Sequence, residues 1–267
     1  QGNARIIYYI GEFFRFPRDF SSLVYLSQVM QAETVRIAVE HLRRNRLRAM
    51  GSLYWQLNDC WPTISWSSVD YFGRYKALHY RARHFYNPVL LTFAVNGEKQ
   101  EAELYIANDL TQPLAGTYRW ALIGLKGEVI REEQGRFSVA ASSPSKIATI
   151  KTALSHDELK NAVLVAGAVD DAGNIYECDA AFVPDKYLAL VKPRFELALK
   201  QEAGLYRLTI ESDAVAKFLE ISVSGTDVVF SDNYFFLRPG EKKTVTWHSD
   251  KTITLDDLAL RSLVDAY

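Results

Sequence analysis

The sequence predicts a helical α/β segment followed by two all-β domains, and a change of pattern at Pro88 carries this prediction. Before Pro88, apolar residues recur at the spacing of amphipathic helices. After it, short alternating runs are separated by turns such as Asn96-Gly97 and residues 170–174. The chain has 267 residues, of which 48% are hydrophobic, so it can bury more than one core.

Two helices are predicted before Pro88. Residues 23–48 have one apolar face and a basic end that suits a helix C-terminus. A second helix follows Gly73 and is ended by Asn87-Pro88. Its apolar face consists of Tyr75, Leu78, Ala82 and Phe85. Basic residues punctuate this helix, but neighbouring acids favour a solvated outer face over a nucleic-acid-binding surface.

The segment between the helices predicts a ligand site. Residues 53–57 are expected to form a short strand buried on both faces. Polar groups follow at its carboxyl end, where α/β sheets and barrels place ligands, and they are Gln56, Asn58 and Asp59. Three indole rings lie nearby in sequence, those of Trp55, Trp61 and Trp66. Aromatic faces beside planar hydrogen-bonding groups indicate a sugar-binding mouth, and the alternative is that the indoles fill a core.

Seven short strands predict an immunoglobulin-like sandwich after Pro88. They are residues 92–95, 102–108, 117–125, 128–133, 146–151, 163–169 and 175–182. Residues 184–193 read as a connector. A smaller sandwich follows, with strands at residues 195–199, 205–212, 218–224, 228–230, 243–248 and 258–263. Trp120 and Trp247 are isolated among strand alternations and are expected in the cores.

Composition excludes several classes of function. The formal net charge is −1, which gives no electrostatic reason to expect a nucleic acid or an anionic membrane as partner. No run of 18 apolar residues occurs, and the first residues are neither a signal peptide nor a start methionine, so the chain is expected to be a truncated piece. Cys60 and Cys178 fall in different predicted domains, so no framework disulfide is expected and the compartment stays open.

Metal and nucleotide chemistry are not predicted either. The five histidines show no metal-ligand spacing with the cysteines. Residues 170–174 are rich in aspartate, but they lack the rest of a calcium loop and suit a hairpin turn better. Phosphate-binding glycine loops and serine-elbow motifs are absent from the sequence.

Residues 55–80, which begin Trp-Gln-Leu-Asn-Asp-Cys-Trp-Pro, resemble the last barrel strand and helix of β-mannosidases in glycoside hydrolase family 2. Residues 25–32 resemble the penultimate barrel helix, and residues 230–235 and 239–241 resemble the family's final β-sandwich. The resemblance implies the C-terminal end of a (β/α)₈ TIM barrel at residues 1–90. Immunoglobulin-like β-sandwiches are then expected at residues 91–187 and 188–267.

This resemblance implies a parent enzyme that removes terminal, non-reducing β-D-mannose residues with retention of configuration. Such enzymes use two carboxylates about 5 Å apart. The family's two glutamate motifs are absent here, and Gly11-Glu12-Phe13 imitates one of them on the wrong side of the Gly2-Asn3 match. No catalytic residue is therefore assigned, and the chain alone is expected to be inactive. No metal or organic cofactor is implied.

For the parent, the resemblance implies a β-mannoside oligosaccharide substrate held by this segment. Trp55 is expected to be the platform under the cleaved ring, with Asn58 and Asp59 shaping that wall and Trp61 as a weaker candidate. A periplasmic or extracellular location is favoured, with a lysosomal one as the alternative, and the oligomeric state is open. Two rival functions are a family 2 enzyme of β-galactosidase or exo-glucosaminidase type and a non-catalytic carbohydrate-binding or scaffold module.

Overall fold

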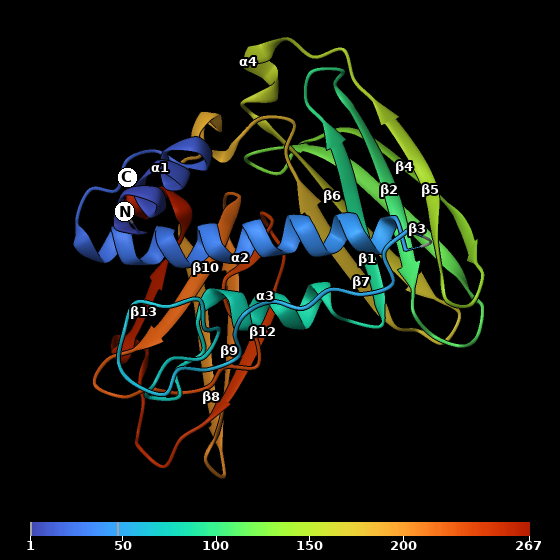
Figure 1. The fold of residues 1–267 in the computed structure, drawn as a ribbon. Coiled ribbons are helices and arrows are strands. Elements are labelled where there is room, and N and C mark those ends of the chain that lie inside the picture. The colour runs from blue at the N-terminus through green and yellow to red at the C-terminus, as the bar shows by residue number, and fades with distance from the viewer. Residues whose placement is uncertain (1, 47) are drawn as a thin grey trace. The chain divides into compact units, whose positions relative to one another are not determined.

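The computed structural model describes residues 2–46 and 48–267. The chain forms two compact units. The first unit comprises Gln1–Thr34, Tyr54–Ala82 and Leu190–Tyr267, and the second comprises Val35–Leu53 and Arg83–Ala189. Each unit therefore combines part of the helical segment with one set of strands (Figure 1).

Three helices precede Pro88, where the sequence predicted two. They are α1 (Gly2–Phe13), α2 (Phe20–Arg44) and α3 (Ala77–Phe85). Helix α2 confirms the long predicted helix and begins where the Asp19 carboxylate accepts a hydrogen bond from the Ser22 amide at 2.7 Å. It ends at Arg44 rather than Arg48, and Leu47 lies outside the described residues. Helix α1 was not predicted; among its described side chains only Ile10 is buried.

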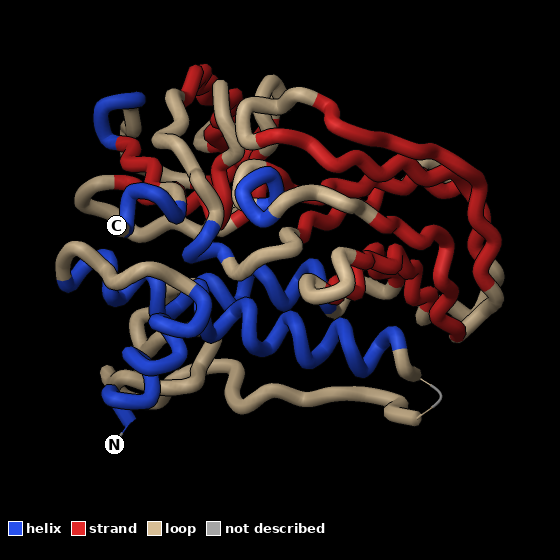
Figure 2. The backbone as a smooth tube through the Cα atoms, turned by 90° about the horizontal axis from the view of Figure 1, so that it is seen from above, coloured by secondary structure: helices blue, strands red, loops and turns tan. Residues whose placement is uncertain are grey.

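The predicted strand at residues 53–57 is wrong. This stretch is irregular, and Figure 2 shows the chain between α2 and α3 as a long loop. Isolated bridges pair Asn58 with Val69 and Val69 with Tyr75. The Leu53 side chain is fully exposed to solvent. An apolar run becomes a strand only beside partner strands, and no strand of the described residues pairs with this one.

The strands of the second unit form two antiparallel sheets, as predicted for an immunoglobulin-like sandwich. One sheet has the order β1-β2-β5 and the other β4-β3-β6-β7. Their bounds are Val89–Asn96 (β1), Glu101–Asn108 (β2), Leu114–Gly124 (β3), Val129–Val139 (β4), Ser143–Lys151 (β5), Ala162–Asp170 (β6) and Ile175–Ala180 (β7). A short helix, α4 (His156–Leu159), precedes β6. Trp120 on β3 is buried in the core, as expected.

The turn between β6 and β7 is the hairpin that the sequence predicted in place of a calcium loop. One Asp170 carboxylate oxygen accepts hydrogen bonds from the amides of Ala172 and Asn174, at 3.0 and 2.8 Å. Its other oxygen accepts from the Asn174 side chain and the Tyr176 hydroxyl. Gly173 has a φ of +86°, which glycine adopts without a Cβ penalty. The Asp170 carboxylate therefore stabilises the hairpin turn.

The strands of the first unit also form two antiparallel sheets, ordered β12-β9-β8 and β11-β10-β13. The bounds are Phe195–Glu202 (β8), Leu205–Ser212 (β9), Ala216–Val223 (β10), Phe235–Leu237 (β11), Lys243–His248 (β12) and Leu258–Arg261 (β13). Trp247 is buried and stacks on Tyr206 at 5.3 Å between ring centroids. Short 3₁₀ turns occupy Asp185–Tyr187, Leu255–Asp257 and Leu263–Ala266.

The predicted strand at residues 228–230 is wrong, and β11 lies at Phe235–Leu237 instead. Phe230 is buried, but its amide donates to the Tyr80 hydroxyl at 3.3 Å rather than to a neighbouring strand. The next amide, of Ser231, donates to the Thr246 carbonyl at 2.7 Å. These backbone groups are satisfied without a ladder, so a run of three apolar residues was mistaken for a strand.

Candidate functional site

The candidate site is the loop of residues 54–75, in which three extended stretches lie side by side in the first unit. The Val69 amide donates to the Leu57 carbonyl at 2.8 Å, and the Asp59 amide donates to the Val69 carbonyl at 3.2 Å. The Asp70 amide donates in turn to the Arg74 carbonyl at 3.0 Å. This short ladder gives the loop a fixed backbone, although little of it counts as regular structure.

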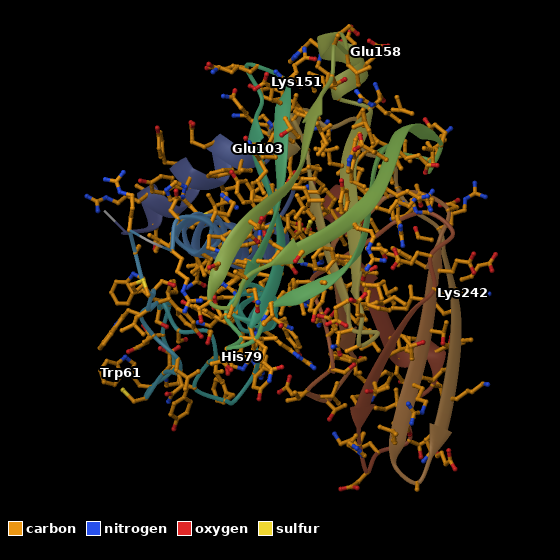
Figure 3. The ribbon with its side chains drawn as sticks, turned by 90° about the vertical axis from the view of Figure 1, so that its right-hand side faces the viewer. Trp61, His79, Glu103, Lys151, Glu158 and Lys242 are labelled. Atoms are coloured by element: carbon orange, nitrogen blue, oxygen red, sulfur yellow. The ribbon has the colours of Figure 1, made fainter. Side chains whose placement is uncertain are left out.

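Three tryptophan side chains project from this loop. Trp55, Trp61 and Trp66 are 74%, 64% and 68% exposed, whereas the core residues Trp120 and Trp247 are 1% and 2% exposed. Figure 3 shows Trp61 at the periphery of the loop, away from His79, which belongs to helix α3. Within the described residues the three indoles therefore lie outside the packed cores.

Asp59 anchors the loop instead of lining an open surface. Its two carboxylate oxygens accept hydrogen bonds from the hydroxyls of Ser65 and Ser67, at 2.6 and 2.5 Å. The Lys76 ammonium donates to the Ser67 hydroxyl at 2.8 Å and lies 3.7 Å from the carboxylate. The Ser65 and Ser67 hydrogen bonds, followed by the Lys76 charge, hold the pKa of Asp59 below its usual value. The carboxylate is therefore ionised at neutral pH, and both of its oxygens accept hydrogen bonds from the loop.

Ser68 is a second anchor within the loop, and its side chain is completely buried. Its hydroxyl donates to the Leu57 carbonyl at 3.0 Å and also contacts the Tyr54 hydroxyl at 2.9 Å and His79 Nδ1 at 3.1 Å. A serine hydroxyl has one proton and two lone pairs, so Tyr54 and the Nδ1–H of His79 must donate to it. The tautomer of His79 is assigned by this count. Burial lowers the pKa of His79, so its ring is neutral near pH 7.

The predicted site residues thus separate into two kinds. Trp55, Trp61 and Asn58 are exposed, whereas Asp59 is buried under the loop. The side chains that hold the loop were not predicted from the sequence. They are Ser65, Ser67, Ser68, Lys76 and His79. The cluster of serines directly after Trp61-Pro62 was the available signal, because short hydroxyl side chains satisfy backbone groups in irregular loops.

A separate cavity of about 240 Å³ lies in the second unit, at the end of α2. The three exposed tryptophans do not line it. The Arg43 guanidinium at its wall donates to the carbonyls of Phe85 and Asn87, both at 2.7 Å, and pairs with Asp109 at 3.0 Å. Arg43 therefore joins the end of α3 to the loop after β2.

The described residues contain no cluster of His, Cys, Asp or Glu able to hold a metal ion. Glu12 lies on α1 with its side chain exposed. Across residues 2–46 and 48–267, no helix is long and apolar enough to span a membrane.

Two family models match the β-rich part of the chain. Residues 100–187 match a mannosidase Ig/CBM-like domain, and residues 190–266 match the Ig-fold domain of a mannosidase model. The chain is 30% identical over 272 residues to β-mannosidase A of Aspergillus terreus, covering 92% of the chain and 29% of that protein. It thus spans less than a third of the length of this relative.

Solved structures show the same fold. A β-D-mannosidase from Dictyoglomus thermophilum matches with a TM-score of 0.86 and 24% identity, over 98% of this chain and 32% of the other. An exo-chitosanase from Amycolatopsis orientalis matches with a TM-score of 0.70 and 19% identity, over 92% of this chain and 34% of the other.

Helices followed by two mannosidase-type Ig domains define a C-terminal class of glycosidase segment. The chain corresponds to a C-terminal portion of the β-mannosidases of glycoside hydrolase family 2.

Proposed function

We propose that the protein containing this chain is a retaining, exo-acting β-mannosidase that removes terminal, non-reducing β-D-mannose from oligosaccharides. The relatives that cover 92–93% of the chain carry the name β-mannosidase A. The observation that carries the proposal is the exposed indole of Trp55 on a loop anchored by Asp59 and Ser68. Such a platform beside amide groups is suited to the apolar face of a sugar ring.

In this proposal residues 1–90 are the end of a (β/α)₈ barrel, and residues 91–187 and 188–267 are two Ig-like domains. The exposed apolar side chains support the first assignment, because they need partners in a larger fold. In the first unit they include Tyr8, Ile64, Trp66 and Phe72. The barrel's missing strands would cover these side chains and turn residues 53–57 into a paired strand.

In this arrangement Trp55 is the platform under the cleaved sugar ring, and Asn58 and Trp61 line the wall of the same subsite. Asp59 contributes to the subsite indirectly, because its hydrogen bonds fix the loop that carries these side chains. The catalytic carboxylate pair lies in the part of the enzyme outside this chain, and the two-carboxylate mechanism uses no cofactor.

The rival of a carbohydrate-binding module has less support. Such modules bind with aromatic side chains on an exposed sandwich face, and Trp120 and Trp247 are buried. Tyr187, on a 3₁₀ turn, is the one aromatic among the large exposed apolar side chains of the described residues after Pro88.

The test is hydrolysis by the full-length protein of aryl β-mannoside, β-galactoside and β-glucosaminide under matched conditions. The proposal expects the mannoside to have the highest kcat/KM, with the β-anomer of mannose released first in the proton NMR spectrum. Preference for the glucosaminide would favour an exo-glucosaminidase, the activity class to which the exo-chitosanase fold neighbour belongs. Absence of all three activities would contradict the proposal.

A further inference from the structure

The last Ig domain and the tryptophan loop are joined by a continuous line of side chains within the first unit. Tyr234 lies in the segment that follows β10, and Tyr80 lies on α3. Their ring centroids are 6.1 Å apart. Both side chains are buried, at 5% and 6% exposure, so this contact is part of a packed core.

The domain end of this line is fixed by several interactions. The Tyr234 hydroxyl donates to the Glu220 carboxylate at 2.6 Å, and its ring stacks on Tyr25 of α2 at 6.2 Å. The Tyr80 hydroxyl accepts a hydrogen bond from the Phe230 amide at 3.3 Å. Burial raises the pKa of Tyr80 to about 12, so the hydroxyl stays protonated at any working pH. Helix α3 is thus held on this domain by both the ring and the hydroxyl of Tyr80.

The loop end of the line begins with Tyr75. Tyr75 contacts Tyr80 edge-on at 5.7 Å and lies 4.1 Å from the His79 ring. His79 reaches the buried Ser68 hydroxyl, which holds the Leu57 carbonyl two residues after Trp55. The backbone follows the same route, since the Lys76 amide donates to the Ser68 carbonyl at 2.9 Å.

A second link joins the same two parts. The Arg74 guanidinium donates to the Asp227 carboxylate at 2.9 Å, and Asp70 accepts from the amides of Phe72 and Arg74, both at 2.9 Å. Asp227 belongs to the segment between β10 and β11. This pair is exposed and contributes little stability by itself, but it restricts the turn that closes the loop.

We propose that the C-terminal Ig domain is a positioning element for the sugar-binding loop, acting through Tyr234, Tyr80, Tyr75 and His79 on Ser68. These are positioning residues, because they act through the loop and not on the sugar. An indole platform helps catalysis only when its face is held at the ring, and a shift of about 1 Å is costly. The catalytic part of this inference rests on the proposed function, whereas the structural part does not.

The test uses the full-length protein and three variants. Tyr80→Leu removes both ring contacts, Ser68→Ala removes the anchor under Leu57, and Tyr118→Leu is the control. Tyr118 is a comparably buried tyrosine on β3 of the other sandwich, outside the line of contacts. Amide hydrogen exchange of residues 54–69, thermal stability and kcat/KM for an aryl β-mannoside are measured on each.

We expect Tyr80→Leu and Ser68→Ala to speed exchange in residues 54–69 about tenfold or more and to lower kcat/KM about 10- to 100-fold. The double variant should lose less than the product of the single losses, because both changes cut one line of contacts. Tyr118→Leu should lower the melting temperature while exchange in the loop and kcat/KM stay within about twofold of the parent.

The inference is overturned if loop exchange stays unchanged in Tyr80→Leu, or if Tyr118→Leu loosens the loop equally. If Tyr80→Leu fails to fold, Tyr75→Leu replaces it, because it removes the ring contacts with Tyr80 and His79 at a partly exposed position. A parent that hydrolyses no glycoside contradicts the proposed function, and the exchange measurement still decides the positioning role.

Discussion

At the scale of single residues, the site depends on short polar side chains beneath exposed aromatic ones. The indoles of Trp55, Trp61 and Trp66 face solvent, and Asp59 and Ser68 fix the backbone from which they project. A carboxylate that receives two hydroxyl hydrogen bonds stabilises a loop that has little regular structure of its own. Asp59 is therefore better understood as a support of the site than as one of its walls.

The first prediction concerns this carboxylate. Asp59→Asn leaves the size unchanged but weakens the hydrogen bonds from Ser65 and Ser67, so we expect a loss of about 1–3 kcal/mol in unfolding free energy near pH 7. The folded-state pKa of Asp59 is lowered, so its contribution is present above the unfolded-state pKa of about 3.9 and is lost as pH falls through the folded-state pKa.

The measurement is the unfolding midpoint of parent and Asp59→Asn from pH 7 down to pH 3. The gap between the two curves should narrow on the acidic side. A constant gap over this range would show that the charge of Asp59 does not contribute.

At the scale of elements, the C-terminal half of α2 is fixed to β1 by a buried ionic group in the second unit. The Glu40 carboxylate accepts from Arg36 at 2.9 Å and from the Thr92 hydroxyl at 2.7 Å. Arg44 donates to the same hydroxyl at 2.9 Å. Glu40 and Thr92 are buried, so removal of the negative charge leaves cations in a poorly solvated place.

We therefore predict that Glu40→Gln lowers the unfolding free energy by about 2–4 kcal/mol. The matched control is Glu101→Gln on β2, whose partner Lys151 is exposed and for which a much smaller loss of unfolding free energy is expected. Figure 3 labels Lys151 on β5 and Glu103, which lies on β2 as Glu101 does. Urea unfolding of the 267-residue chain followed by fluorescence compares the two, and equal losses would contradict the special role of the buried group.

A further prediction at this scale concerns α1 and residues 53–57. In the 267-residue chain their amides should exchange faster than those of β3 and β6, because few of their side chains are buried. In the full-length protein the same amides should be protected by the rest of the barrel. Equal exchange in the two proteins would argue against the proposed barrel segment.

Elements with local apolar periodicity could be predicted from the sequence, whereas those that depend on distant partners could not. Helix α2 and the strands of the first sandwich were predicted because their apolar periodicity is satisfied by neighbours close in the chain. The strand at residues 53–57 failed because an apolar run does not show whether a partner strand exists. The binding mouth at the tryptophans stays a prediction. The serines that hold the loop were not predicted, since hydrogen bonds between loop residues leave no periodic signal.

At the scale of the whole molecule, we propose that the chain supplies a loop and its supports, with the catalytic pair in another part of the protein. We predict that purified residues 1–267 do not hydrolyse an aryl β-mannoside, whereas the full-length protein does. Turnover by the short chain that is abolished by Glu12→Gln would place a catalytic carboxylate on α1. It would contradict the proposal that the catalytic pair lies outside this chain.

The most direct measurement of the central claim is the kinetics of Trp55→Ala in the full-length protein, together with its melting temperature. If the indole stacks on the sugar as the ring flattens, kcat/KM per folded molecule should fall about 10- to 1000-fold, equivalent to about 1.4–4 kcal/mol. A lower melting temperature with unchanged kcat/KM would show that Trp55 only packs against the rest of the barrel, and would remove it from the site.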